Sequence, residues 1–157
     1  MTLAAVAIGS NLGDRRATVT WAIGQLALVL HGLRISRIIE TEPVEVHEPQ
    51  PPYLNAVVVG ETDLPVDVLF ERLRALEQQR GRTRLTYRAA RTLDLDLVLY
   101  GSLVVDTPGL TVPHPRFRQR RFVLEPLSEV AGDWVDPVTG RSAEALLADL
   151  SAKEKGA

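Results

Sequence analysis

The sequence predicts an α+β fold of the ferredoxin-like kind, in which a mostly antiparallel sheet has helices packed against it and is followed by an extra C-terminal hairpin and helices. Strand-like stretches and helical stripes alternate in the order β-α-β-β-α-β. The connection between the second and third strands, residues 42–52, holds four prolines and no helical stripe. Because parallel strands need a long crossover, usually a helix, this connection favours antiparallel pairing with the helices on one face.

Length and composition are those of one globular domain. The chain has 157 residues, of which 45% are hydrophobic and 24% charged, and its net charge is −2. This is enough for a hydrophobic core and gives no overall reason to expect nucleic acid as a partner. We therefore expect a single domain over residues 1–157, with residues 153–157 as a frayed tail. Without a basic leader, a membrane-length apolar run or an interface stripe, we expect a cytoplasmic monomer with no membrane partner.

The chain contains no cysteine. Disulfides, thiolate catalysis and cysteine-based metal sites are therefore excluded. The three histidines, His31, His47 and His114, are far apart and lack the spacing of zinc ligands.

The first third of the chain predicts a strand, a helix and a second strand. The apolar run over residues 3–8 is typical of a buried strand, and Asp14 is placed to cap the following helix. An apolar stripe extends this helix to about Gly32, since glycine often ends helices, and residues 33–41 alternate as a second strand. The segment between strand and helix, residues 9–14, lacks the Gly-Lys-Ser/Thr of a Walker A loop, so on its own it indicates a plain turn.

The middle of the chain predicts a third strand and a second helix. Residues 53–60 are strongly β-forming, and Tyr53 and Asn55 share one face of that strand. An aromatic ring beside an amide that both donates and accepts hydrogen bonds suits a ligand site. Taken alone, Tyr53 also suits a strand edge, and Asn55 a turn in which its amide is hydrogen-bonded. Pro65 opens a helix that runs through Gln79.

The last third predicts one more sheet strand and several C-terminal elements. We expect the strand at residues 93–100, with residues 103–106 as its hairpin partner. Prolines predict an extended backbone for residues 110–115. Apolar stripes predict helices at residues 116–130 and 142–150.

The expected strand at residues 93–100 carries the main candidate for chemistry. Four leucines alternate there with Asp94 and Asp96, and side chains two residues apart leave the same face of a strand. The leucines are therefore expected in the core and both carboxylates on the other face, where a hard cation such as Mg²⁺ would relieve their repulsion. The alternative is an ordinary strand whose acidic face is solvated.

Arginines concentrate in two places. Nine of the sixteen arginines lie within residues 80–91 and 116–121, and the first of these segments contains no acid. Guanidinium groups bind phosphate oxygens, so arginines beside a magnesium site favour a nucleotide-phosphate site. In the second segment we expect Arg116, Arg118 and Arg121 to be solvated.

Seven short motifs occur in order along nearly the whole chain. They are residues 7–13, 41–43, 53–57, Glu77 with 81–84, 91–96, 110–115 and 120–127. With these motifs the chain resembles the 6-hydroxymethyl-7,8-dihydropterin pyrophosphokinases, a family of folate-biosynthesis enzymes. The resemblance implies transfer of pyrophosphate from ATP to the hydroxymethyl group of the dihydropterin, with AMP as the other product and two Mg²⁺ ions as cofactors.

The resemblance also implies roles for particular residues. By position, Asp94 and Asp96 would bind the metal ions, and Arg82 and Arg91 would engage the phosphates during transfer. The residues that would contact ATP are Arg82, Arg84, Arg91, Leu97, Thr111, His114 and Arg120. The residues that would contact the pterin, enclosing its flat ring between two aromatic side chains, are Thr41, Val44, Tyr53, Asn55 and Phe122.

Two positions depart from the family pattern. Residues 88–90 are Arg-Ala-Ala where many members have an aromatic residue, Gly and Pro. The ring that would cover the nucleotide is therefore missing, or is replaced by Tyr87 or Arg88. Glu45 stands where a glycine is common. We expect these changes to affect loop closure and the KM, and to leave the chemistry unchanged.

Other interpretations of the same residues stay open. The basic segments would also suit a nucleic-acid-binding ferredoxin-like module, although only 5% of the residues are aromatic and two strand acids would repel a phosphate backbone. A different Mg²⁺-dependent nucleotide transferase, or a relative that only binds ATP, is compatible with the motifs. Taken alone, His114 fits a structural loop histidine and Phe122 a core residue. Glu77 keeps an open role, as an ion-pair partner of Arg74 or Arg80.

Overall fold

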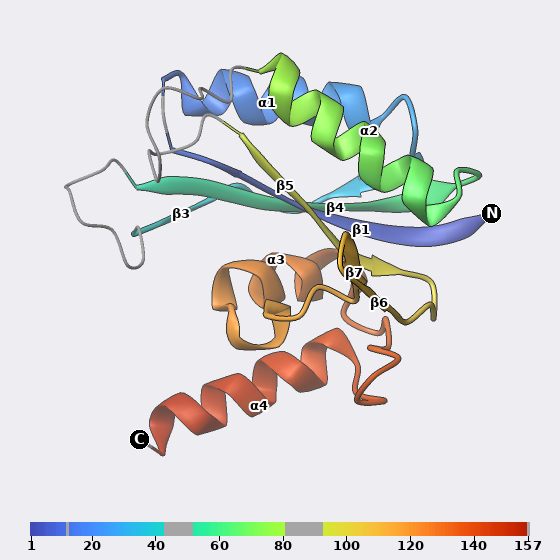
Figure 1. The fold of residues 1–157 in the computed structure, drawn as a ribbon. Coiled ribbons are helices and arrows are strands. Elements are labelled where there is room, and N and C mark those ends of the chain that lie inside the picture. Colours follow the sequence, from blue (N-terminus) through green and yellow to red (C-terminus); the bar gives the residue numbers. More distant parts are fainter. Residues whose placement is uncertain (12, 43–51, 81–92, 157) are drawn as a thin grey trace.

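The computed structural model describes residues 1–11, 13–42, 52–80 and 93–156. Its elements, shown in Figure 1, are β1 (Thr2–Ser10), α1 (Arg15–Leu26), β2 (His31–Ile35), β3 (Ile39–Thr41), β4 (Tyr53–Thr62), α2 (Val66–Gln79), β5 (Asp94–Tyr100), β6 (Val105–Thr107), β7 (Leu110–Val112), the 3₁₀ helix η1 (Phe117–Gln119), α3 (Arg121–Ala131) and α4 (Ala143–Lys155). Within these ranges, no helix combines the length and the apolar character needed to cross a membrane.

The fold is α+β and ferredoxin-like, built on one antiparallel sheet. The strands lie in the order β2-β4-β1-β5, β3 also pairs with β4, and each of these pairs is antiparallel. β1 lies between β4 and β5, and most of its residues are buried. The predicted antiparallel sheet is confirmed, and it places β5, the strand of the two aspartates, at an edge.

Helices cover both faces of the sheet (Figure 1). On one face, α1 and α2 enclose a core that includes Leu26, Leu73 and Leu95. On the other, α3 and α4 enclose a second core that includes Val57 and Leu124. The expectation of helices on one face therefore holds for α1 and α2 alone. The central strands are apolar on both faces, so the C-terminal helices are needed to cover the second one.

The side-chain alternation of β5 is interrupted at one residue. Val6 of β1 pairs with Leu97. Its neighbour Ala5 pairs with Leu99, so Val98 is an extra residue, as in a β-bulge. Leu97 lies in the first core, whereas Leu99 lies in the second. The expectation that all four leucines share one face is therefore wrong for Leu99, because strict alternation assumes an uninterrupted ladder.

The first helix ends earlier than predicted. α1 stops at Leu26, and β2 begins at His31. Gly32, expected to end the helix, lies inside β2 with a φ of 61°, where the register between β2 and β4 shifts. Glycine adopts this conformation without a steric cost. The predicted strand over residues 33–41 is divided between β2 and β3.

The segments after β5 also differ from the prediction. β6 pairs with β7 in a separate hairpin, so residues 103–106 do not pair with β5. The helix expected over residues 116–130 is divided into η1 and α3, and Arg120 between them has an extended backbone. α4 continues to Lys155, so most of the expected frayed tail is helical.

Candidate active site

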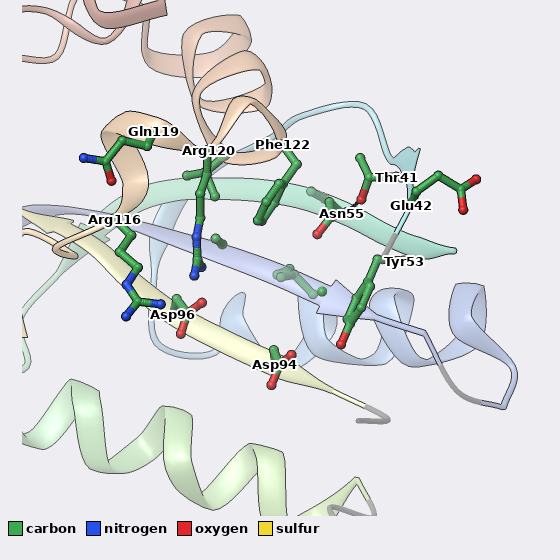
Figure 2. Close-up of a pocket in the computed structure, with 15 residues that line it drawn as sticks. Thr41, Glu42, Tyr53, Asn55, Asp94, Asp96, Arg116, Gln119, Arg120 and Phe122 are labelled. Carbon is green, nitrogen blue, oxygen red and sulfur yellow. Dashed lines mark hydrogen bonds between the residues drawn. The ribbon is translucent and has the colours of Figure 1, made fainter. Parts of the chain in front are cut away.

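A pocket with a volume of about 490 Å³ opens on the α3 side of the sheet (Figure 2). β1, β4 and β5 supply one wall, and η1 and α3 supply the other, with residues from the end of β3. Its polar and aromatic lining residues are Thr41, Glu42, Tyr53, Asn55, Asp94, Asp96, Arg116, Gln119, Arg120 and Phe122. Acids, arginines and aromatic rings from distant parts of the chain therefore face one cavity.

Small residues of β1 form the floor of the pocket. Gly9 pairs with Asn55 on one side and with Asp94 on the other. A Cβ atom at Gly9 would lie 3.3 Å from Asn55 Oδ1 and 3.9 Å from Asp94 Cβ. The sequence predicted a turn at Gly9. In the structure Gly9 belongs to β1, because the strand continues to Ser10. The missing side chain leaves room for a ligand between the amide and the carboxylate.

Asp94 and Asp96 point into the pocket, as the alternation predicts (Figure 2). Across the ladder they pair with Gly9 and Ala7, so small side chains flank both carboxylates. The described residues contain no group of three or more His, Cys, Asp or Glu side chains that could hold a metal ion. Mg²⁺ usually keeps several waters and binds one or two carboxylates together with substrate phosphates. This pair of aspartates therefore fits Mg²⁺ better than it fits a metal that needs a full set of protein ligands.

Two arginines and a glutamine line the pocket from η1 and the residues on either side of it. Arg116, Gln119 and Arg120 all border the cavity, and Figure 2 shows Arg116 and Arg120 extending toward Asp96. The guanidinium carbon of Arg120 lies 5.5 Å from the centre of the Phe122 ring, so the cation is held over an aromatic face. The sequence predicted Arg120 but missed Gln119, and Arg116 was expected to be solvated. Their direction depends on a 3₁₀ turn where the sequence indicated a continuous helix.

The other two arginines of this segment form ion pairs. Arg118 donates to both carboxylate oxygens of Asp136, at 2.6 and 3.0 Å, and only 1% of the Asp136 side chain is exposed. Arg121 donates to Ser151 at 2.8 Å and to Glu154 at 2.6 Å. The expectation that these arginines are solvated is wrong for Arg118, whose partner is buried, whereas the Arg121 side chain is partly exposed and forms an ion pair at the surface. Both connect the η1–α3 region to the C-terminal part of the chain.

The residues expected to bind a flat ring lie together at one end of the pocket. Tyr53 at the start of β4 and Phe122 in the first turn of α3 both border the cavity (Figure 2). Asn55 lies between them and donates from Nδ2 to the Thr41 hydroxyl at 2.5 Å. That bond orients the amide and leaves its Oδ1 on the side of Gly9. Four residues assigned to the pterin site therefore surround one part of the pocket.

Three residues expected to contact ATP do not line this cavity. The Leu97 side chain is buried in the core under α1 and α2, so it points away from the pocket. Thr111 lies in β7, where its hydroxyl donates to Asp106 at 3.4 Å. His114 follows β7, and its backbone N–H donates to the Val98 carbonyl at 3.0 Å. Thr111 and His114 thus lie on a segment that runs beside β5.

The remaining predicted site residues, Val44, Arg82, Arg84 and Arg91, lie outside the described residues. The two departures from the family pattern, at residues 88–90 and at Glu45, also lie outside them. The roles assigned to these positions stay predictions.

His114 is half-buried and neutral. Burial is the main cause that lowers its pKa, the Asp96 carboxylate opposes this effect, and Arg120, Arg116 and Arg118 add to it. Its Nδ1 accepts a hydrogen bond from the Arg116 backbone N–H at 3.1 Å, which requires that Nδ1 carries no proton. The proton of the neutral ring therefore lies on Nε2.

Acid should destabilise the protein through His114. The folded-state pKa lies below the unfolded value of about 6.5, so the unfolded chain binds the proton first and stability falls as the pH drops through this range. We expect His114→Asn, which keeps an acceptor for the Arg116 N–H, to lose less stability than the wild type between about pH 7 and pH 5. Urea denaturation in metal-free buffer measures this, with the exposed His31→Asn as control. The same pH dependence in all three proteins would contradict the assignment.

Fold and pocket together define a class of protein. Carboxylates that suit Mg²⁺ face arginines that suit phosphate oxygens, and an aromatic slot adjoins them in the same cavity. This arrangement is typical of an enzyme that transfers a phosphorus-containing group from a nucleotide to a flat acceptor.

Comparison with known proteins identifies the family. The family model described as 7,8-dihydro-6-hydroxymethylpterin-pyrophosphokinase (HPPK) matches residues 5–132. The chain is 41% identical over 140 residues to the 2-amino-4-hydroxy-6-hydroxymethyldihydropteridine pyrophosphokinase of Synechocystis, covering 88% of this chain and 71% of that protein. It is 38% identical over 140 residues to the protein of the same name from Haemophilus influenzae, covering 87% and 86%. The chain therefore belongs to the 6-hydroxymethyl-7,8-dihydropterin pyrophosphokinase family.

Solved structures share the fold. The crystal structure of Plasmodium falciparum HPPK-DHPS with pteroate matches 99% of this chain with a TM-score of 0.74 at 12% identity. A structure of HPPK-DHPS in complex with substrates also matches 99% of this chain, with a TM-score of 0.78 at 10% identity. The chain spans 44% and 46% of the length of these two structures, respectively. At these identities the similarity concerns the fold alone.

Proposed function

We propose that this protein transfers the pyrophosphoryl group of ATP to the hydroxymethyl group of 6-hydroxymethyl-7,8-dihydropterin, requires Mg²⁺ and releases AMP, as a step of folate biosynthesis. The observation that carries this proposal is the single pocket in which Asp94 and Asp96 face Arg116 and Arg120 beside an aromatic slot. The names of the relatives from Synechocystis and Haemophilus influenzae support it. On the sequence arguments, we also propose that it acts as a monomer in the cytoplasm.

The proposed reaction demands little covalent chemistry from the protein. The hydroxymethyl oxygen forms a bond to the β-phosphorus of ATP, and its proton is released to water. The bond between that phosphorus and the bridging oxygen of AMP breaks. Such a transfer depends on alignment of the two substrates and on neutralisation of the charge on the phosphates. A cavity that holds both substrates side by side would provide the alignment.

Asp94 and Asp96 are the residues that would hold Mg²⁺, with two ions expected. Bound there, the metal would neutralise and orient the phosphates of ATP. Both carboxylates face the cavity above the small residues of β1, so hydrated ions and phosphate oxygens have access to them.

Arg116 and Arg120 would bind phosphate oxygens from the wall opposite the aspartates. A guanidinium group is always charged and presents planar donors that match phosphate oxygens. By resemblance, Arg82, Arg84 and Arg91 would complete the phosphate contacts.

The nucleoside part of ATP would lie along β5. Thr111 and His114, on the segment that runs beside this strand, would contact it with their side chains. Leu97 would contribute its backbone alone, because its side chain belongs to the core.

The pterin would lie between Tyr53 and Phe122, with its polar edge on Asn55. We expect Asn55→Ala to weaken pterin binding by about 10- to 100-fold, since a buried hydrogen-bonding amide is lost. Thr41→Val, which removes only the acceptor that orients this amide, should have a smaller effect in the same direction. Calorimetric titration with the pterin measures both, and ATP binding serves as the internal control. Unchanged pterin affinity in Asn55→Ala would contradict the assignment.

A nucleic-acid-binding module is the less favourable alternative. Such a module would stack bases on an open sheet face with exposed aromatic residues. Here α1 and α2 cover one face and α3 and α4 cover the other, while the pocket presents two carboxylates that would repel a phosphate backbone (Figure 1).

The products formed from ATP test the proposal. The protein is incubated with ATP and Mg²⁺, with and without 6-hydroxymethyl-7,8-dihydropterin, and AMP and ADP are separated by chromatography. We expect AMP that depends on the pterin, and no ADP. ADP as the product would indicate an ordinary kinase. ATP binding without any product would indicate a relative that only binds the nucleotide.

A further inference from the structure

We infer that Arg74 and Glu77 of α2 are positioning residues for the strand of the two aspartates, and that they control how the enzyme uses Mg²⁺. The inference rests on the proposed function, in which Asp94 and Asp96 bind the metal. It concerns the outer edge of β5, on the side away from β1.

Both backbone polar groups of Leu95, the residue between the aspartates, are bonded to α2. The Leu95 N–H donates to Glu77 Oε2 at 2.8 Å, and the Leu95 carbonyl accepts from Arg74 Nη2 at 3.2 Å. The two side chains are also bonded to each other, since Arg74 Nη1 donates to Glu77 Oε1 at 2.7 Å. Three hydrogen bonds therefore close around one residue of β5. We call Arg74 and Glu77 together the α2 clamp.

The α2 clamp takes the place of a neighbouring strand. In the described part of the sheet, β5 pairs with β1 and forms an edge. The outward N–H and C=O groups of an edge strand find no strand partner. At Leu95 the α2 clamp supplies one acceptor and one donor instead. The residues on either side of Leu95 pair inward with Gly9 and Ala7, so this part of β5 is held from both sides.

The burial of Glu77 supports a positioning role. Only 1% of its side chain is exposed, whereas 32% of the Arg74 side chain is. A buried carboxylate is costly to desolvate, and a buried ion pair often adds little net stability. Arg74 is held in addition by the Phe70 ring, whose centre lies 4.7 Å from the guanidinium carbon. The buried Glu77 carboxylate is therefore better explained by a role in orienting this segment of β5 than by a contribution to stability.

The consequence concerns the metal site. Two like-charged carboxylates repel each other without a cation and are drawn together by one. An edge strand held on one side only would shift between these states, and the α2 clamp resists that shift. Its loss should therefore weaken the use of Mg²⁺. The described pterin residues, which lie on β3, β4 and α3, should be unaffected.

Glu77→Gln and Arg74→Lys test the inference, with Glu71→Gln on the exposed side of α2 as the matched control. Glu77→Gln keeps the side-chain size and an acceptor but removes the charge that pairs with Arg74. Arg74→Lys keeps the charge, but one ammonium group cannot replace a guanidinium that bonds to Glu77 and Leu95 together. Glu77→Gln keeps the size of the side chain and Arg74→Lys keeps its charge, so both variants should fold. Their melting temperatures verify this.

The readouts are steady-state kinetics across Mg²⁺ concentrations and amide hydrogen exchange of Leu95. We expect kcat to fall, and the half-saturating Mg²⁺ concentration to rise, by about 10- to 100-fold, as is usual when a group that orients a metal ligand is lost. The KM for the pterin should stay within about twofold, because the substitutions do not alter the residues that contact the pterin. Exchange of the Leu95 amide should become faster in both variants and stay unchanged in Glu71→Gln.

Two results would overturn the inference, and one would overturn the proposed function beneath it. Variants that match Glu71→Gln in Mg²⁺ dependence show that the α2 clamp does not act on the metal site. A lower kcat at unchanged Mg²⁺ dependence and unchanged Leu95 exchange also overturns it, since the substitutions then lower turnover without acting on this strand segment. If Asp96→Asn keeps normal Mg²⁺-dependent turnover, the proposed metal site fails, whatever the α2 variants do.

Discussion

Asp96→Asn should abolish turnover and leave the fold intact. The substitution keeps the size of the side chain and removes the charge of one of the two aspartates that face the pocket. We expect kcat to fall by about a thousandfold or more, since removing a single preorganised electrostatic group already costs 10²- to 10³-fold in comparable sites. The metal-free protein should not be destabilised, because a repulsion between neighbouring carboxylates is relieved.

The loss should be specific to the metal site. Asp63→Asn, an exposed carboxylate between β4 and α2, is the matched control and should behave as the wild type. In the presence of ATP, Mg²⁺ should raise the melting temperature of the wild type and of Asp63→Asn, and should do so far less for Asp96→Asn. Near-normal turnover of Asp96→Asn would refute the metal assignment.

Arg118→Met should cause the largest loss of stability. Arg118 binds both oxygens of the buried Asp136, and its guanidinium carbon lies 4.8 Å from the centre of the Phe117 ring. Removing one partner of a buried pair leaves the other charge uncompensated, which costs about 3 kcal/mol of unfolding free energy. Urea denaturation at neutral pH measures this cost.

The pH dependence separates a lost ion pair from lost packing. Burial by itself would raise the pKa of Asp136, but hydrogen bonds from Arg118, Thr139 and the Val138 N–H hold this pKa below its usual value. Stability from the paired carboxylate is therefore present above its unfolded pKa of about 3.9 and is lost as the pH falls through the folded pKa. The difference between Arg118→Met and the wild type should accordingly shrink in acid. A difference that stays constant with pH would indicate lost packing.

An exposed pair of the same geometry is the control. Arg141 binds both oxygens of Asp149, at 3.0 and 2.7 Å, but about half of each side chain is exposed. Water and salt screen such a pair, so Arg141→Met should change the unfolding free energy by less than about 0.5 kcal/mol. Equal effects of the two substitutions would contradict the argument from burial.

Periodicity predicted the parts of the structure that depend on one element alone. The alternation in β5 correctly placed Asp94 and Asp96 on one face, and the motif around Tyr53 and Asn55 correctly placed these two residues together. The prediction failed at Leu99, because a bulge depends on the register with β1, which no local pattern encodes. Helix ends failed for a similar reason, since Gly32 serves a strand irregularity and not a helix stop.

Contacts between distant elements could be predicted only in part. The i, i+3 spacing made Arg74 a candidate partner for Glu77, and that pair is present. The bond from Leu95 to Glu77 crosses 18 residues and follows from the packing of α2 on β5, which the sequence does not display. Likewise, Arg116 reaches the pocket because a 3₁₀ turn replaces the expected first turn of a helix.

In the proposed reaction, two phosphates leave ATP as one unit and reach the pterin. The most direct test uses ATP labelled with radioactive phosphorus at either the α or the β position, together with Mg²⁺ and 6-hydroxymethyl-7,8-dihydropterin. We predict that the β label appears in the pterin product and the α label in AMP, and that Asp96→Asn transfers neither. A β label that stays in ADP, or an α label attached to the pterin, would contradict the proposed function.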